Sequence, residues 1–136
     1  MMLKFSNNAD AIDFYESLAH LFYAIAMSDG SMTREEKLKI IASVEQHWSV
    51  PIDTTNSKEI MYQTLRDLIA NKQKSSRAFE IFQMYYSNHI AIFSEQLKHT
   101  IKEACDAIVS SFNKKNKSEI IMLTQLNLLF KKKLER

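Results

Sequence analysis

Acidic residues gather around the only glycine of the chain, and they are the residues most suited to chemistry. Asp29 adjoins Gly30, and Glu35 and Glu36 follow shortly afterwards. Hard divalent cations bind several carboxylate, carbonyl and water oxygens, so these three acids are candidate metal ligands. An EF-hand is excluded. With Gly30 at the sixth loop position, Ile25 would occupy the first position, where a calcium loop requires Asp.

The same segment also fits a structural role at the start of a helix. Thr33 and Glu36 form a Thr-x-x-Glu capping box. In this motif each side chain accepts a hydrogen bond from the backbone N–H of the other residue. Gly30 suits the left-handed backbone that often follows a helix end. Asp29 and Glu35 are favourable charges near a helix start. Because many such capping pairs bind nothing, we favour the structural interpretation, and the metal site remains the alternative.

Residues for other chemistries follow no catalytic or metal-binding spacing. The four histidines, His20, His47, His89 and His99, form no His-x-x-x-His pair, which a helical zinc site would require. The single cysteine, Cys105, falls in an apolar stripe and is expected to be a buried, inert thiol. One glycine is too few for a phosphate-binding loop. We therefore expect a protein that is not an enzyme.

The elements that position these residues are predicted to be helices. Apolar residues recur at three- and four-residue steps, as in helices that bury one stripe. One Gly and one Pro are too few for the turns of β or α/β folds. The periodicity predicts helices near residues 10–28, 33–48, 60–69, 79–93, 94–112 and 120–130, the fourth kinked near residues 87–89. We expect an all-α fold with a single compact domain over residues 1–136.

The same periodicity predicts which side chains form the core. Ser94 is the expected cap of the fifth helix. The aromatic residues of the fourth helix are assigned to the core, with a ligand cavity or a groove for a partner helix as the alternative. The predicted buried residues include Ile12, Tyr15, Leu18, Phe22, Ile25, Ala26, Leu38, Phe79, Phe82, Tyr85, Tyr86, Phe93, Leu97, Ile101, Ile108, Ile120, Leu123, Leu126 and Phe130.

Charge and cysteine content bound the partners and the compartment. Lys and Arg number 18 against 16 acids, for a net charge of +2, so no nucleic-acid partner is expected. Lysines near residues 114–117 and 131–133 complement a helix dipole, with contact to anionic lipid as the alternative. A lone cysteine excludes an internal disulfide, and no export signal or spanning segment is predicted. We expect a cytoplasmic protein.

A weak internal repeat links the two halves of the chain. Residues 20–44 overlay residues 103–127 when Glu36 is aligned with Glu119. The overlay predicts two similar helical hairpins. Glu119 thereby joins Asp29, Glu35 and Glu36 as a candidate metal ligand.

The segment from Ala26 to Glu36 resembles the signature of the TerB-like family of bacterial tellurite-resistance proteins. The resemblance rests on Ala26, Asp29, Gly30, Met32 and Glu36, in an Ala-x-x-Asp-Gly-x-(apolar)-x-x-x-Glu pattern between two amphipathic helices. It implies an all-helical fold of two related helical groups, with a second copy of the motif in the carboxy-terminal half.

The second motif departs from the family pattern. Phe112 and Asn113 stand where Asp and Gly would be, and only Glu119 is retained. The family resemblance implies a stress-response protein that binds a divalent metal ion through acidic residues and associates with protein partners or the inner face of the membrane. We therefore expect a non-enzymatic binding or scaffolding module. The alternative is a metal-free helical adaptor that mediates protein–protein interaction.

Overall fold

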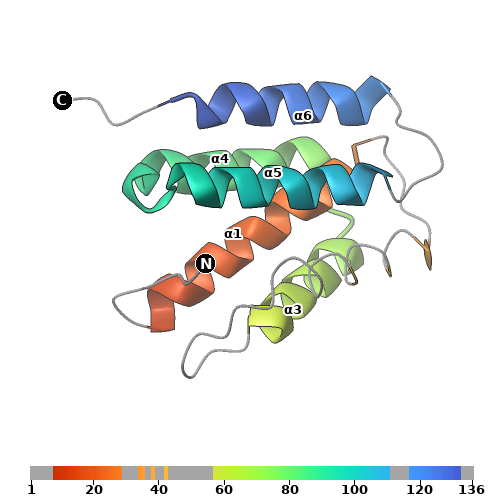
Figure 1. The fold of residues 1–136 in the computed structure, drawn as a ribbon. Coiled ribbons are helices and arrows are strands. Elements are labelled where there is room, and N and C mark those ends of the chain that lie inside the picture. The colour runs from red at the N-terminus through yellow and green to blue at the C-terminus, as the bar shows by residue number, and fades with distance from the viewer. Residues whose placement is uncertain are drawn as a thin grey trace.

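The computed structural model describes residues 8–28, 34–35, 38, 42, 57–110 and 117–132, and these residues are arranged in helices without a strand (Figure 1). The predicted all-α fold is therefore confirmed. Arg34, Glu35, Leu38 and Ala42 are helical, and the rest of the predicted second helix lies outside the described residues. The helices are α1 (Asn8–Ala26), α3 (Ser57–Ala70), α4 (Ser75–Asn88), the short 3₁₀ helix η1 (Ile90–Ile92), α5 (Glu95–Ser110) and α6 (Lys117–Phe130).

Helix α1 lies at the centre of the core. It contacts α3, α4, α5 and α6, with α3 and α6 on opposite sides of it (Figure 1). Every residue from 21 to 26 is buried. Because a helix that is apolar all round is stable only when other elements surround it, α1 takes this central place.

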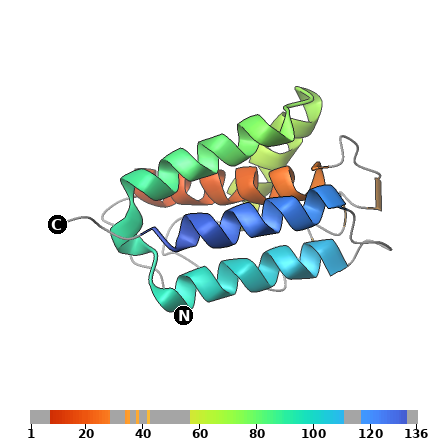
Figure 2. The same ribbon diagram turned by 90° about the horizontal axis from the view of Figure 1, so that it is seen from above.

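The view from above shows how α6 sits over α1, between α4 and α5 (Figure 2). Its inward stripe consists of Glu119, Met122, Leu126, Leu129 and Phe130. No helix in the described residues combines the length and the apolarity needed to cross a bilayer.

The connections around α4 use specific local geometry. After α3, the N–H of Gln73 bonds the carbonyl of Leu68 at 3.1 Å, and Lys72 has φ 50°; together these define a Schellman ending. The Tyr23 hydroxyl of α1 donates to the carbonyl of Gln73 at 2.6 Å. This bond fixes the turn between α3 and α4 on the central helix.

The junction between α4 and α5 corrects one prediction and confirms another. The fourth helix was expected to continue, kinked, to Phe93, but α4 ends at Asn88 and η1 follows. The break occurs because His89 leaves helical geometry at φ −137° and ψ 32°. The hydroxyl oxygen of Ser94 accepts the N–H of Leu97 at 3.1 Å, so the predicted cap of the fifth helix is confirmed.

Among the residues that the structure describes, three that were predicted in the core are exposed. Ile12, Leu38 and Ile120 are 38%, 58% and 50% accessible. In α6 the reason is visible: Glu119 takes the inward position of the first turn, and the adjacent residue, about 100° further round the helix, then faces out. When a helix carries apolar residues on both faces, its sequence does not determine which face turns toward the core.

Candidate binding groove

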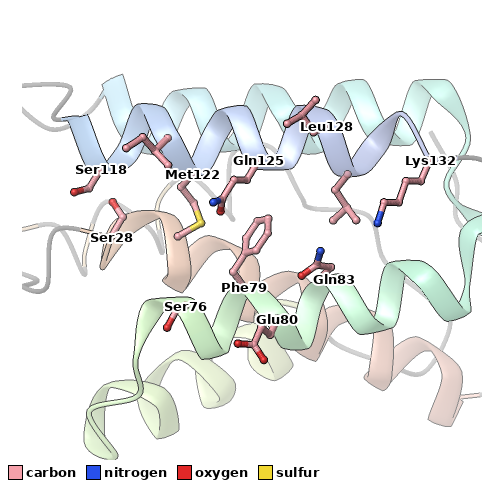
Figure 3. Close-up of a pocket in the computed structure, with 12 residues that line it drawn as sticks. Ser28, Ser76, Phe79, Glu80, Gln83, Ser118, Met122, Gln125, Leu128 and Lys132 are labelled. Carbon is pink, nitrogen blue, oxygen red and sulfur yellow. The ribbon is translucent and has the colours of Figure 1, made fainter.

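A groove lies between α4 and α6, and the end of α1 closes it at one side (Figure 3). Its volume is about 630 Å³. The groove is lined by Ser28, Ser76, Phe79, Glu80, Gln83, Ser118, Ile121, Met122, Gln125, Leu128, Leu129 and Lys132. An apolar interior bordered by serines, glutamines and charged groups is the composition of a binding surface with a polar rim.

The interior of the groove comes from buried apolar side chains of both walls. Phe79 of α4 and Met122 of α6 point into the space between the helices (Figure 3). With Leu129 they are almost fully buried. These side chains pack on the core beneath, so the groove has a firm apolar base.

The α6 wall carries further apolar residues that face solvent. Ile121 and Leu128 line the groove and are 49% and 59% accessible, and Ile120, outside the lining and about 100° further round the helix, is 50% accessible. Residues seven apart lie on the same helix face, so Ile121 and Leu128 form one stripe. Large apolar side chains grouped on one face, rather than scattered, are typical of an interaction surface.

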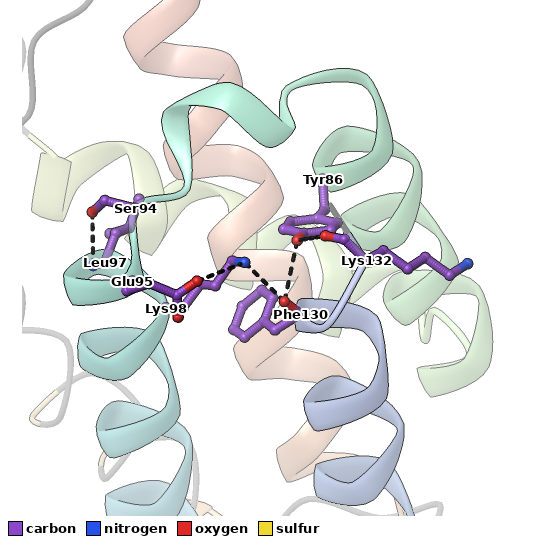
Figure 4. A network of polar contacts seen from close by, with 7 residues as sticks. All are labelled: Tyr86, Ser94, Glu95, Leu97, Lys98, Phe130 and Lys132. Carbon is purple, nitrogen blue, oxygen red and sulfur yellow. Dashed lines mark hydrogen bonds and ion pairs between the residues drawn. The ribbon is translucent and has the colours of Figure 1, made fainter. Parts of the chain in front are cut away.

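Hydrogen bonds fix the carboxy-terminal end of the α6 wall to its neighbours (Figure 4). The Lys98 ammonium of α5 donates to the carbonyl of Phe130 at 2.8 Å, and the Tyr86 hydroxyl of α4 donates to the carbonyl of Lys132 at 2.6 Å. Glu95 lies 3.5 Å from the same ammonium. Lys98 is only 5% accessible, and its buried ammonium is tolerated because it donates to the Phe130 carbonyl at the negative end of a helix.

Charged residues along the groove differ between its two walls. On α4, Glu80 is paired with Arg77 at 3.1 Å. On α6, Lys132 lines the groove, and Lys117 and Lys131 are exposed elsewhere on the helix, whereas Glu119 is 2% accessible. The α6 wall therefore presents positive charge to solvent.

The predicted metal ligands are only partly within the described residues. Glu35 is exposed on its helical segment, and Glu119 is buried in the first turn of α6. Asp29, Gly30 and Glu36 lie outside the described residues. Within the ranges that the structure describes, no group of three or more His, Cys, Asp or Glu residues is placed to hold a metal ion. The metal site remains a prediction from the sequence.

The Cys105 thiol is buried in the core, and His20 and His99 contact neighbouring residues on their own helices. Cys105 is fully buried as predicted, and burial, with a smaller contribution from Asp106, raises the pKa of its thiol well above the ordinary value. A protonated, buried thiol is a poor nucleophile. Nδ1 of His20 lies 2.7 Å from the carbonyl of Glu16. Nε2 of His99 lies 2.8 Å from the carboxylate of Glu103.

The aromatic residues of α4 mostly form the core, as predicted. Phe82 and Tyr86 are fully buried and stack against Phe93. Tyr85 is half-buried and stacks on His89 with 4.0 Å between ring centroids. Burial, followed by the charges of Asp13 and Asp10, raises the pKa of Tyr85 to about 12.

A groove for a partner helix was predicted only as the alternative role of the aromatic residues of the fourth helix, and the α6 wall of this groove was not predicted. Its signal was nevertheless present in α6, where the run Ile120 to Leu123 and the run Leu128 to Phe130 place apolar residues around the whole helix.

In comparisons with protein-family models, curated proteins and solved structures, none matches this chain.

Proposed function

We propose that this protein is a non-enzymatic helical adaptor that docks another protein in the groove between α4 and α6. One observation carries the proposal: α6 buries one apolar face on α1 and turns a second, with Ile120, Ile121 and Leu128, to solvent. Exposed apolar area beside a preformed groove gains free energy when a partner covers it.

The polar border of the groove supports docking rather than catalysis. Gln83, Gln125, Ser76 and Ser118 supply hydrogen-bonding groups around an apolar base. This pattern suits a protein interface, in which an apolar centre gives affinity and the rim gives orientation.

The adaptor proposal is compatible with the TerB-like resemblance but does not depend on it. A stress-response scaffold of that family, in the cytoplasm or at the inner face of the membrane, would use such a surface to hold a partner. A divalent ion bound by Asp29, Glu35, Glu36 and Glu119 would be a separate site. Calorimetric titration and thermal melting with calcium, magnesium, manganese and zinc test that site, because an ion that binds the folded state raises the melting temperature.

Site-directed photo-crosslinking tests the docking proposal. Leu128 on α6 and Tyr62 on α3 are both exposed apolar residues, at 59% and 37% accessibility, and their helices lie on opposite sides of α1 (Figure 1). Each is replaced in turn with p-benzoylphenylalanine in cells that make the protein, and adducts are identified by mass spectrometry. We expect one other protein of the cell to crosslink to position 128 and not to position 62. Equal labelling from both positions, or adducts only of the chain with itself, would contradict the proposal.

A further inference from the structure

We infer that the partner segment that fills the α4–α6 groove is an acidic amphipathic helix. Such a helix has one apolar stripe that packs on the groove and carboxylates beside the stripe that face the lysines of α6. This inference rests on the proposed docking function and specifies the chemistry of its partner.

The shape of the groove favours a helix. The wall from residue 118 to residue 130 extends about 18 Å at 1.5 Å per residue. Ile121 and Leu128 are spaced by seven residues along it, and the buried Met122 and Leu129 repeat the same spacing one residue later. A helix with apolar residues at i, i+3 or i+4 and i+7 matches this repeat, which is the usual mode of helix docking in grooves. Strand addition needs a sheet edge, and the described residues form no sheet.

The charges on α6 favour an acidic helix. Lys117 is exposed at the start of α6, and Lys131 and Lys132 are exposed at its end. The acid of α6, Glu119, is buried and so is removed from the solvent-facing side. Carboxylates of a partner that lie beside these lysines gain attraction and faster association.

The bonds at the end of α6 strengthen this positive character. The Lys98 ammonium and the Tyr86 hydroxyl both donate to carbonyls of the last turn, where the helix dipole is negative. These donors compensate the partial negative charge. Lys132 keeps its side chain on the groove (Figure 3), since its bond to Tyr86 uses only its backbone carbonyl.

Charge argues against a second copy of this chain as the occupant. Antiparallel pairing of two α6 helices would place Lys117 of one copy near Lys131 and Lys132 of the other, and parallel pairing would align the same lysines. Like charges across an interface oppose association. A lipid surface is also disfavoured, because stable attachment through charge takes about four to eight clustered basic residues, and of the described lysines only Lys132 lines the groove.

Titration with synthetic helices tests the inference. The acidic probe is a fluorescein-labelled 16-residue peptide with Leu at positions 2, 5, 9, 12 and 16, Glu at flanking positions and Ala elsewhere. The basic probe replaces each Glu with Lys and keeps the same leucines. Fluorescence anisotropy is measured with the full chain at low and at 0.15 M salt, which separates screened charge from apolar contact.

We expect the acidic probe to bind about tenfold more tightly than the basic probe, with the preference smaller at higher salt. Lys132→Glu should weaken the acidic probe by about three- to tenfold and strengthen the basic one. Leu128→Ser should weaken both by about tenfold, since it removes apolar contact and not charge. Arg66→Glu and Tyr62→Ser on α3 are the matched controls, and both probes should bind these variants as they bind the original chain.

The outcomes separate this inference from the docking proposal. Equal binding of both probes, with sensitivity only to Leu128→Ser, would overturn the acidic partner and leave the docking groove in place. Binding of neither probe would also overturn the inference, and photo-crosslinking from position 128 would then decide the docking proposal independently. A dimer of the chain that Leu128→Ser abolishes would identify a second copy as the occupant. Binding to phosphatidylserine vesicles that Lys132→Glu removes, without binding of the acidic probe, would identify a membrane.

Discussion

Helices α1 and α6 both carry apolar residues on more than one face, but the fold treats them differently. Helix α1 contacts four other helices, and each residue from 21 to 26 is buried. Helix α6 packs on α1 and α5 and leaves Ile120, Ile121 and Leu128 about half exposed. A helix with apolar residues on all sides is fully buried only when other helices surround it, as they surround α1. An apolar side that the chain itself does not cover, as in α6, is available to a partner.

The largest expected effect is a difference in unfolding free energy between a substitution in α1 and one on the exposed face of α6. Phe22 of α1 is 1% accessible, so Phe22→Ala should lower the free energy of unfolding by about 3–5 kcal/mol through lost burial and a cavity. Leu128 of α6 is 59% accessible, and Leu128→Ala should change it by less than about 0.5 kcal/mol. Urea denaturation followed by circular dichroism measures both variants. A loss at Leu128 as large as that at Phe22 would mean that this face of α6 is already covered within the protein.

The next effect concerns how firmly the end of α6 is held. Lys98→Met keeps the side-chain length but removes the donor to the Phe130 carbonyl, and it should destabilise the protein by about 1–3 kcal/mol. Lys102→Met, one turn later on α5, is the matched control. Its ammonium lies 5.9 Å from the Phe130 ring centroid, an interaction that contributes about 0.5–1 kcal/mol. Equal losses in the two variants would show that the bond to the carbonyl adds nothing beyond charge near the ring.

A smaller, stabilising effect is expected at the turn that α1 holds through Tyr23. Lys72 has φ 50°, a left-handed conformation that is unfavourable for residues with a Cβ atom. Lys72→Gly should therefore raise the free energy of unfolding by about 0.5–1 kcal/mol. Lys74→Gly is the control, because Lys74 has φ −71° and ψ 138°, which any residue adopts, and this change should be neutral or destabilising. Destabilisation by both substitutions to the same extent would contradict the Schellman geometry.

A further effect is a dependence of stability on alkaline pH. The folded pKa of Tyr85, about 12, lies above the ordinary value of 10.0. The folded state therefore holds this proton more tightly, so the contribution is fully present below pH 10 and is lost as pH rises from 10 to 12. Tyr85→Phe should reduce the fall in stability over this range. Part of the fall should persist, because burial also raises the pKa of Tyr23. An unchanged slope in Tyr85→Phe would contradict the assignment.

The sequence was sufficient for the fold class and for local features whose causes are local. The helices, the Ser94 cap and the buried Cys105 follow from periodicity and from hydrogen bonds between near neighbours. The end of α4 at Asn88 was harder to predict, because Phe93 keeps the helical spacing of apolar residues and still enters the core after the chain has left the helix.

The α6 wall of the groove could not be predicted, because it depends on the distance and rotation between helices far apart in the sequence. Rotation of α6 by about one residue buries Glu119 and exposes Ile120, and periodicity alone does not distinguish these settings when both faces are apolar. The role of Lys98 was equally hidden. Lysine side chains are ordinarily exposed, and only the packing of α5 against α6 brings the end of a helix within reach of Lys98.

Hydrogen exchange with and without the acidic probe tests the central claim most directly, namely that α6 presents a docking face. Amides are followed by mass spectrometry in the full chain, with the basic probe as the control. We expect the acidic probe to slow exchange in α6 and in the facing part of α4, while α3 is unchanged. Protection of α3 in place of α6 would contradict the docking face, whereas equal protection of α6 by both probes would remove only the preference for an acidic partner.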